Sequence, residues 1–332
     1  MNRRIIAEIG SVHDGSFGNA CKLIEAAAAA GADVVKFQTH IAEAETLADA
    51  PMPSYFKGEP RMEYFRRTAF SRTQCRELMK VAAGVGVEWI SSPFSLEAVD
   101  FLEELGMRVY KIPSGEVSNL PLHEKIAATG KPVLLSSGMS SWTELDRAVD
   151  VYRSAGNPLV VMQCTTEYPC APEHVGLNVL AEIRERYGVP AGFSDHTLDL
   201  AAPVAAAALG ATVIEKHFTF SRLMYGSDAR HSLEPGEFRR MVDAIRATWT
   251  MLDHPVDKSD AGRFAEMKRV FEKSIVSAVA LPAGTVIETA HLAFKKPGDG
   301  IPAADYGRLL GRRLRVDVPA DHKFRLTDFQ ET

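Results

Sequence analysis

The chain has few cysteines and no long apolar run, and both observations limit the classes of protein to which it can belong. Its four cysteines show no CxxC spacing, which argues against a disulfide framework and against a zinc site built on cysteine pairs. The longest alanine-rich runs, 26–30 and 201–208, fall well short of a membrane span. No cationic, apolar signal precedes the first apolar run. We therefore expect a reducing, cytoplasmic setting, with the thiols packed as small hydrophobic groups and no membrane as a partner.

Charge of one sign is not in excess either. The 38 basic and 43 acidic residues of the 332-residue chain leave a formal net charge of −5. From Phe271 onward, nine Lys and Arg face eight Asp and Glu. Neither nucleic acid nor an anionic membrane is therefore an expected partner. The hydrophobic content of 46% is that of an ordinary soluble protein, and the length accommodates one large and one small domain.

Short β-rich apolar runs alternate with helical patterns over most of the chain. We count eight such pairs, which is the number that closes a (β/α)8 barrel, whereas an open doubly wound sheet usually stops earlier. The predicted strands are 5–9, 33–38, 87–92, 109–112, 132–136, 159–164, 191–194 and 212–215. We therefore predict an α/β protein with a TIM barrel over residues 1–252, a polar linker over 253–270 and a small α+β domain over 271–332.

A longer excursion, roughly Ile41 to Phe70, follows the second predicted strand. Its central part, 51–60, contains three prolines and two aromatic residues, a composition too irregular for a helix and too aromatic for a disordered linker. We expect a loop that covers the substrate, because long loops in compact domains are usually functional or disordered. A loop at an interface between subunits is the alternative.

Nearly every predicted strand ends in polar or charged side chains. The carboxyl ends of parallel barrel strands share one mouth, where such folds do their chemistry. Serines there often cap the next helix, as we expect of Ser140 or Ser141 before Glu144, but capping gives no reason for lysines and glutamates. The strand-end residues are Glu8, Lys36, Gln38, Ser92, Lys111, Ser114, Ser136, Ser194, His196, Glu215 and His217.

The residue types at this mouth indicate a metal and an anion. His196 and His217 close neighbouring strands, and two neutral imidazoles beside Glu215 suit a divalent metal with open coordination positions, although both could be satisfied structural histidines. Lys36 and Lys111 with hydroxyls around them indicate an anion that carries both carboxylate and phosphate. No GxxxxGK[ST] loop is present, so a nucleoside triphosphate site of that type is not indicated. A base role for Glu8 and an ion pair of Glu8 with Lys36 both stay open.

Seven short motifs resemble those of the sialic acid synthases, in that family's order and at its spacing. They are IAEIG at 6–10, VVKFQT at 34–39, SSPF at 91–94, YKIPSGE at 110–116, LSSGM at 135–139, FSDHT at 193–197 and EKHFT at 215–219. The segment KKPGDGI at 295–301 resembles part of the family's C-terminal antifreeze-like (SAF) domain. The similarity runs the full length, so a TIM barrel followed by a SAF domain is what the resemblance implies.

The resemblance also implies an activity. The family's enzymes are metal-dependent transferases that condense phosphoenolpyruvate with an N-acyl hexosamine-type aldehyde, such as N-acetylmannosamine or a 2,4-diacetamido-6-deoxyhexose. The products are a nine-carbon 2-keto acid (a nonulosonate) and phosphate. The metal is Mn²⁺ or Mg²⁺, and the enzyme is a homodimer in which the small domain of one subunit swaps over to the barrel of the other.

Individual roles follow from the same resemblance. His196 and His217 would bind the metal, Glu8 would be the acid/base that handles water, and Glu215 would assist near the metal. Phosphoenolpyruvate would be held by Lys36, Ser92, Lys111, Ser114, Ser136 and Ser194. The sugar would be faced by Gln38, Tyr168, Asp228 and Lys296.

Three positions depart from the family's pattern. Thr166 stands where asparagine is frequent, Lys296 stands where an arginine is usual, and Val12 stands where asparagine is common. These departures leave the reaction class intact and the particular sugar open. Two other functions remain as alternatives: a catalytically silent carbohydrate-binding protein, and another metal-dependent barrel lyase or aldolase. A Schiff-base aldolase could use Lys111, and an absence of metal dependence would favour it.

Overall fold

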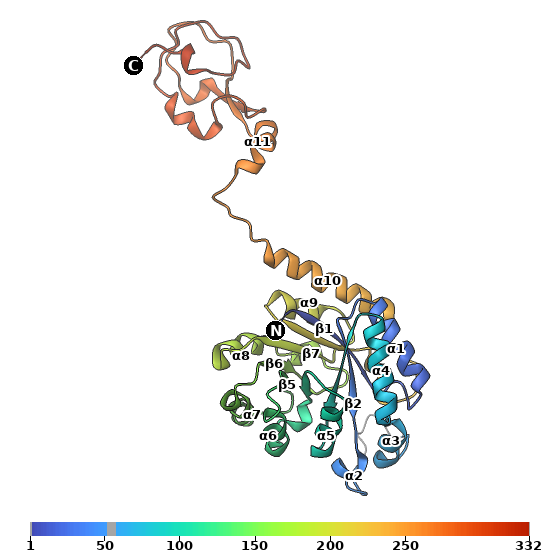
Figure 1. Cartoon of the computed structure of the whole chain (residues 1–332). Coiled ribbons are helices and arrows are strands. Elements are labelled where there is room, and N and C mark those ends of the chain that lie inside the picture. The colour runs from blue at the N-terminus through green and yellow to red at the C-terminus, as the bar shows by residue number, and fades with distance from the viewer. Residues whose placement is uncertain (1, 52–57, 332) are drawn as a thin grey trace. The chain divides into compact units, whose positions relative to one another are not determined.

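The structure is a computed structural model, and it describes residues 2–51 and 58–331. The chain forms two compact units, Met1–His254 and Pro255–Thr332; in Figure 1 the first runs from the blue N-terminal strand to the orange helix α10, and the second contains α11 and the red C-terminal segment. No helix in the described ranges is long and apolar enough to cross a membrane.

The first unit is a closed barrel of eight parallel strands in sequence order, which confirms the predicted fold. The strands are β1 (Arg4–Gly10), β2 (Val34–Thr39), β3 (Glu88–Pro93), β4 (Tyr110–Ile112), β5 (Val133–Ser136), β6 (Leu159–Cys164), β7 (Ala191–Asp195) and β8 (Val213–His217). Strand β1 pairs with β8 from Arg4↔Val213 to Glu8↔His217, and this pairing closes the barrel. Each predicted strand lies within one or two residues of an observed one, except that β8 continues to His217.

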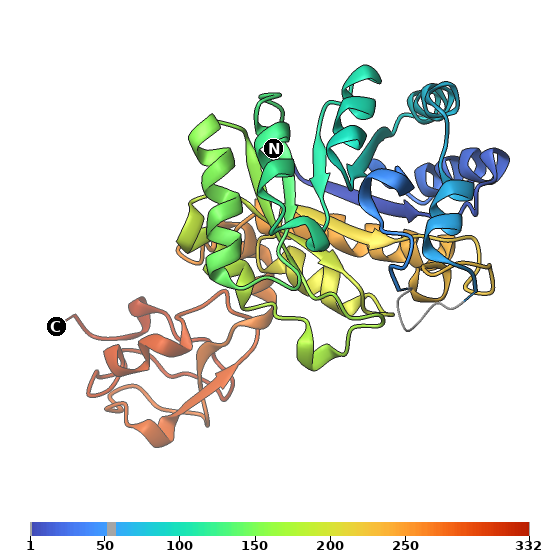
Figure 2. The same ribbon diagram turned by 90° about the horizontal axis from the view of Figure 1, so that it is seen from below.

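Helices cover the outside of the barrel (Figures 1 and 2). They are α1 (Phe17–Ala29), α2 (Ala42–Glu45), α3 (Arg61–Thr68), α4 (Arg72–Gly84), α5 (Leu96–Glu104), α6 (Leu120–Ala127), α7 (Trp142–Ala155), α8 (Val179–Tyr187), α9 (Ala201–Ala208) and α10 (Pro235–Asp253). Several begin as their sequences predict: Ser141 accepts a bond from the Glu144 amide in a capping box at the start of α7. Apolar residues at helical spacing, such as Leu23, Ile24 and Ala27 of α1, are buried against the strands.

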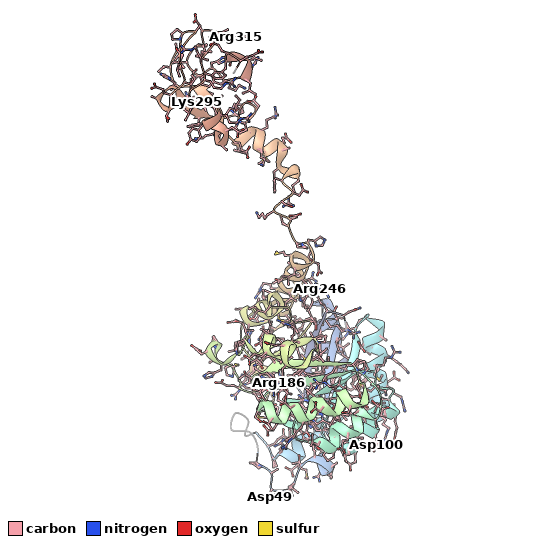
Figure 3. All side chains as sticks on the ribbon, turned by 90° about the vertical axis from the view of Figure 1, so that its left-hand side faces the viewer. Asp49, Asp100, Arg186, Arg246, Lys295 and Arg315 are labelled. Carbon is pink, nitrogen blue, oxygen red and sulfur yellow. The ribbon has the colours of Figure 1, made fainter. Side chains whose placement is uncertain are left out.

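The outer faces of these helices carry charged side chains that pair with one another. Arg186 of α8 and Arg246 of α10, both labelled in Figure 3, form ion pairs with Asp146 and Asp33. Each pair is half-exposed and contributes little to stability. The stability of the barrel therefore comes from the apolar layer between the strands and the helices.

The excursion after β2 is more regular than the sequence indicated. Helices α2 and α3 occupy 42–45 and 61–68, on either side of the segment 51–60 that the sequence indicates is too irregular for a helix. Residues 52–57, on which much of the expectation of a covering loop rested, lie outside the described part of the chain. Arg61, Tyr64 and Phe65 on α3 help to line the pocket at the mouth of the barrel, so this excursion forms part of the pocket wall.

The second unit is a small domain with its own core. Strands β9 (Ser274–Ser277) and β10 (Leu292–Lys295) form an antiparallel pair, and Val286 and Leu314 take part in isolated bridges. The core includes Ile275, Ile287, Leu309, Leu314 and Phe324. Helix α11 (Ala265–Phe271) occupies the end of the segment predicted as a linker. The Gly298 amide donates to the Arg269 carbonyl and ties α11 to this domain, a contact that polar composition does not reveal.

Candidate active site

One pocket at the carboxyl ends of the strands collects nearly all of the residues that the sequence singled out. Strand alternation explains why: Glu215 and His217 of β8 point to the inside of the barrel, while Lys216 between them points outward and pairs with Asp195. The predicted residues that line the pocket are Glu8, Lys36, Gln38, Lys111, Ser114, Ser136, Tyr168, Ser194, His196, Glu215, His217 and Asp228.

Two of the predicted residues are placed differently. Ser92 is not among the residues that line the pocket; it is fully buried, and its hydroxyl accepts a bond of 3.3 Å from Lys36 Nζ. Lys296 belongs to the second unit, where its ammonium lies 5.1 Å from the centroid of the Phe271 ring. Of the three departures, Thr166 lines the pocket and Val12 is buried in the barrel core.

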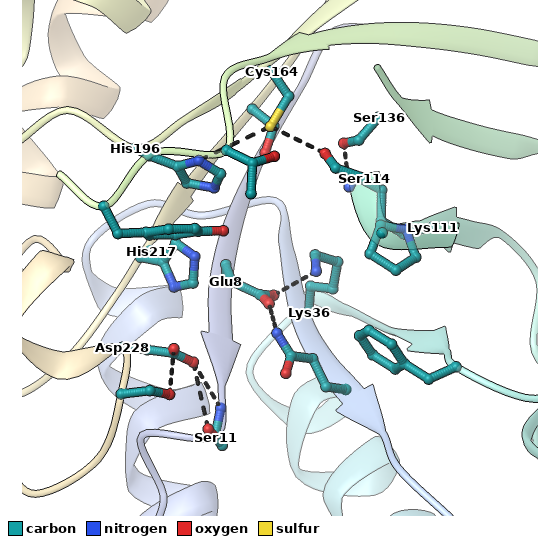
Figure 4. A pocket seen from close by; sticks show the side chains of 18 of the residues that line it. Glu8, Ser11, Lys36, Lys111, Ser114, Ser136, Cys164, His196, His217 and Asp228 are labelled. Carbon is teal, nitrogen blue, oxygen red and sulfur yellow. Dashed lines mark hydrogen bonds and ion pairs between the residues drawn. The ribbon is translucent and has the colours of Figure 1, made fainter. Parts of the chain in front are cut away.

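Two lysines and two glutamates alternate at the floor of the pocket (Figure 4 shows Glu8 and both lysines). Lys36 Nζ lies 2.8 Å from Glu8 Oε2 and 3.8 Å from Glu215 Oε1. Lys111 Nζ lies 3.4 Å from the same Glu215 oxygen and donates to Ser136 Oγ at 2.7 Å. All four charged side chains are almost completely buried. Because the charges balance in pairs, the cluster can exist away from water.

The two carboxylates in this cluster differ in their proton affinity. Burial raises the pKa of Glu8 above its usual value, and Lys36 only partly offsets that rise. Burial also acts on Glu215, but Lys111 and Lys36 outweigh it and hold the pKa of Glu215 at about 2. Two carboxyl groups with separated pKa values are a common arrangement for acid–base chemistry, in which one group exchanges protons and the other stays charged.

The two histidines lie side by side next to Tyr168. Their ring centroids are 5.6 Å apart, and the Tyr168 ring lies 4.2 Å from that of His196. Burial lowers the pKa of His217 to about 4, so its ring is neutral at neutral pH. Its Nδ1 atom is buried and has no hydrogen-bond partner among the described residues. A buried nitrogen with no partner is costly unless a ligand binds it.

His196 is oriented by the chain around it. Its Nδ1 lies 2.7 Å from the Thr165 carbonyl, which fixes the ring and leaves Nε2 for another contact. Burial works to lower the pKa of His196, but the nearby Cys164 and the Thr165 carbonyl raise it above its usual value. The Cys164 thiol lines the pocket and accepts a bond of 3.4 Å from Ser114 Oγ, so it is not only a packing group as the sequence indicated.

Asp228 closes the pocket on the side of β1. The Ser11 amide lies 3.4 Å from Asp228 Oδ2, and Ser227 Oγ donates to Oδ1 at 2.7 Å (Figure 4). A Cβ on Gly10 would lie 2.5 Å from the same Oδ2, and Gly10 has a φ of 51°. Glycine at this position therefore lets the chain turn close to Asp228.

Sequence reasoning missed several residues that line the pocket. They are Ser11, His40, Arg61, Tyr64, Phe65, Phe94, Cys164 and Ser227. His40 and Phe94 directly follow β2 and β3, so the strand-end rule could have included them. Arg61, Tyr64 and Phe65 are spaced i, i+3 and i+4 on α3, but only the three-dimensional course of the excursion brings that face to the pocket.

No three acidic, cysteine or histidine side chains in the described ranges converge as a closed metal cage. The residues nevertheless fit a metal held by two protein ligands, since His217 offers a buried nitrogen without a partner and His196 is oriented by its other nitrogen. The remaining coordination positions would be left for water and substrate.

A closed parallel barrel with buried lysines, carboxylates and paired histidines at the carboxyl ends of its strands has the architecture of a TIM-barrel enzyme. Comparison with known families then places the chain within that class. The NeuB family model matches residues 23–257, and a SAF domain model matches residues 272–330. The chain belongs to the NeuB family, which confirms the resemblance read from its motifs.

Relatives and solved structures agree with this assignment. The chain is 35% identical to N,N'-diacetyllegionaminic acid synthase of Campylobacter jejuni over 97% of this chain and 98% of that protein. It is 35% identical to N-acetylneuraminate-9-phosphate synthase of Homo sapiens over 96% of this chain and 90% of that protein. The crystal structure of N-acetylneuraminic acid synthetase from Leptospira borgpetersenii in complex with citrate matches with a TM-score of 0.71 and 28% identity, covering 81% and 91% of the two chains. The relatives are therefore nonulosonate synthases.

Proposed function

We propose that this protein condenses phosphoenolpyruvate with the open-chain aldehyde of an N-acyl hexosamine-type sugar, giving a nonulosonate and phosphate. The observation that carries the proposal is the buried cluster of Lys36, Lys111, Glu8 and Glu215 beside two histidines, one of which has an unpaired buried nitrogen. The names of the relatives make N-acetylmannosamine and 2,4-diacetamido-6-deoxyhexoses the acceptors to test first.

The lysine side of the pocket suits phosphoenolpyruvate. Lys36 and Lys111 supply two buried positive charges, and hydroxyls next to them supply directed hydrogen bonds. Ser114, Ser136 and Ser194 line the same wall. Ser92 supports this group from beneath through Lys36. Since these donors are fixed before substrate binds, they stabilise charge without reorganisation.

The carboxylates suit the proton transfers that the reaction needs. A new C–C bond forms between the methylene carbon of phosphoenolpyruvate and the aldehyde carbon. Water adds to the carbon that carries the phosphate, and the bond from that carbon to the phosphate oxygen then breaks to release phosphate. Glu8, with a raised pKa, would take the proton of this water and return it as the reaction proceeds. Glu215, with a pKa of about 2, would stay charged and hold both lysines in place.

We assign the metal position to His196 and His217, with Mn²⁺ or Mg²⁺ as the ion. When bound, the ion would supply a Lewis acid for the acceptor's carbonyl oxygen. Gln38, Tyr168 and Asp228 would face the sugar from the same wall of the pocket. Lys296 and the domain-swapped homodimer remain predictions from the resemblance, and the mass of the protein in solution tests the dimer.

The deciding experiment measures phosphate release from phosphoenolpyruvate in the presence of Mn²⁺. The acceptors are N-acetylmannosamine, its 6-phosphate and the 2,4-diacetamido-6-deoxy sugars, each with a reaction that lacks the sugar as its control. Release with one acceptor only would establish both the reaction and the substrate. A protein that binds Mn²⁺ and releases phosphate with none of them would contradict the proposal and favour the catalytically silent carbohydrate-binding protein.

One observation favours a second candidate, an aldolase that forms a Schiff base. Burial lowers the pKa of Lys111, which increases the share of neutral amine that such chemistry requires. Treatment with pyruvate and borohydride would then add mass to Lys111 without any metal. We rank this candidate second because Lys111 Nζ lies only 3.4 Å from the Glu215 carboxylate, which favours the charged ammonium.

A further inference from the structure

A series of part-buried hydrogen bonds runs from Glu8 along the wall of the pocket to a carboxylate on helix α2. Gln38 Nε2 donates to Glu8 Oε1 at 2.8 Å. Gln38 Oε1 lies 3.1 Å from His40 Nε2, and His40 Nδ1 lies 2.7 Å from Glu45 Oε1. These hydrogen bonds therefore link the proposed acid/base Glu8 to Glu45 through the side chains of Gln38 and His40.

The order of donors and acceptors along this chain determines where its protons lie. The Gln38 amide turns its NH₂ group to Glu8, because an ionised carboxylate can only accept. Its carbonyl oxygen then faces His40, so that Nε2 must carry a proton. The other ring nitrogen faces a carboxylate oxygen of Glu45, and a bond there also needs a proton. The contact with Gln38 thus requires that Nε2 of His40 carries a proton.

The surroundings of His40 suit a ring in that state. Its ring lies between two aromatic rings, with centroids 3.9 Å from Phe65 at an interplanar angle of 6° and 4.2 Å from Phe94 at 24°. Two aromatic faces hold the ring in its plane and exclude water. The side chains of His40 and Glu45 are 8% and 6% exposed, so the pair is held in a nearly dry site next to the pocket.

We propose that His40 is a positioning residue that fixes the orientation of the Gln38 amide and thereby keeps an N–H donor on Glu8. Without the protonated Nε2 of His40, the Gln38 amide could turn over and present its oxygen to Glu8. Glu8 would then retain Lys36 as its charged partner but lose its second fixed contact. The inference rests on the acid/base role proposed for Glu8, and it adds His40 and Glu45 to the machinery that supports that role.

A purely structural role for the pair is the competing explanation, since Glu45 lies on α2 and His40 directly follows β2. The chain offers a matched comparison. Glu43, also on α2, accepts a bond of 2.6 Å from Arg66 of α3 and so fastens the same short helix. It has no hydrogen bond to Gln38 or Glu8 among the described contacts. Glu43→Gln therefore removes a contact of α2 without touching the chain that ends at Glu8.

The kinetic test uses two variants. His40→Phe keeps an aromatic ring in the stack and removes both ring nitrogens, and Glu45→Gln is a milder change. We expect His40→Phe to lower kcat by about tenfold to a hundredfold, the scale of a displaced catalytic group, with the KM for phosphoenolpyruvate nearly unchanged. Glu45→Gln should also lower kcat, but by a smaller factor. Glu43→Gln should leave kcat at the wild-type value.

A double-mutant cycle with Gln38→Leu decides whether His40 acts through Gln38. If it does, His40→Phe will have almost no further effect on kcat in the Gln38→Leu background, because the contact it supports is already lost. The same loss of kcat in both backgrounds would overturn the proposal. An equal drop in Tm for Glu45→Gln and Glu43→Gln with kcat retained in both would also overturn it and leave a structural pair.

A spectroscopic measurement keeps the inference separate from the proposed reaction. In protein labelled with ¹⁵N-histidine, NMR should show a ring with a proton on Nε2 whose signal disappears in His40→Phe. A wild-type enzyme that releases no phosphate would sink the proposed function, but this signal would still report the proton arrangement. A His40 ring with no proton on Nε2 at neutral pH would overturn the positioning role directly.

Discussion

Glu8 Oε2 and Lys36 Nζ lie 2.8 Å apart on neighbouring strands, where the register sets the two residues opposite each other. From the sequence, an ion pair and a base role were separate explanations for Glu8. The structure shows the ion pair, yet burial still raises the pKa of Glu8 because the attraction of Lys36 does not fully offset the loss of water. A paired glutamate can therefore remain the group that exchanges protons.

Replacing Glu8 with Gln tests this role. We expect Glu8→Gln to lower kcat by about a hundredfold or more, because the amide cannot take a proton from water. The variant also leaves Lys36 with less negative charge nearby, so its Tm should fall. Stopped-flow or coupled assays of phosphate release measure the first effect, and thermal unfolding measures the second. A variant with wild-type kcat and a lower Tm would show that the pair is only structural.

The metal assignment makes a separate prediction. His217→Ala should abolish Mn²⁺-dependent turnover while the barrel stays folded, because the ring's unpaired Nδ1 makes no contact that the fold requires. His196→Ala should do the same. Titration with Mn²⁺ followed by electron paramagnetic resonance measures binding without any turnover. His174→Ala is the control, because His174 is an exposed histidine that pairs with Glu167. Wild-type Mn²⁺ affinity in both site variants would contradict the assignment.

The strand ends were the part of the site that the sequence could supply. Strand alternation fixed Glu215 and His217 on one face of β8, the pairing of β1 with β2 placed Glu8 opposite Lys36, and closure of the barrel placed Glu8 beside His217. Ser92 shows the limit of that rule, since its place at the end of β3 did not tell whether its hydroxyl faces the pocket or lies beneath Lys36.

Contacts between distant segments account for what the sequence could not supply. His40 acquires its two aromatic neighbours from α3 and from the residue after β3, and neither neighbour is fixed by local periodicity. Local periodicity also does not reveal the contact of α11 with Gly298, because the two segments are distant in sequence and meet only when the small domain folds. Local propensity does not encode such pairings, which are set only when the whole domain packs.

Arg61 carries a prediction about the acceptor. It lines the pocket from α3, its guanidinium lies 5.4 Å from the centroid of the Phe65 ring, and its buried Nε has no partner among the described residues. We expect Arg61→Met to raise the KM for the sugar by about tenfold, with little change for phosphoenolpyruvate, since a lost charged hydrogen bond costs about 1.5–3 kcal/mol. Arg66→Met, outside the pocket, is the control, and equal changes in both KM values would contradict the assignment.

Lys296 carries the corresponding prediction for the second unit. We expect Lys296→Ala to raise the KM for the sugar and to leave that for phosphoenolpyruvate nearly unchanged. Lys296→Arg tests the departure from the family's pattern, because a planar guanidinium can form two parallel bonds where an ammonium forms one. Neighbouring Lys295, which pairs with Asp321, provides the control variant Lys295→Ala. Equal effects on both substrates would argue against a place on the sugar side.

His13 makes the stability of the barrel depend on pH. Its ring is 3% exposed, stacks against Phe37 and Phe70, and accepts a bond from the Gly15 amide at Nδ1. Burial lowers the pKa of His13 from its ordinary 6.5 to about 4. As the pH falls, the unfolded chain therefore binds the proton first, so this contribution is complete above pH 6.5 and is lost between 6.5 and about 4.

We expect the free energy of unfolding to fall by about 2 kcal/mol more in the wild type than in His13→Phe between about pH 7.5 and about pH 5. Phenylalanine keeps a ring in the stack but has no group that titrates, and urea unfolding at the two pH values measures the difference. His174→Phe is the control. Its slope should match the wild-type slope closely, because the exposed pair of His174 with Glu167 contributes little to stability. Parallel slopes for the wild type and His13→Phe would mean that His13 binds its proton equally well in the folded and the unfolded chain, and the lowered pKa attributed to its burial would then be wrong.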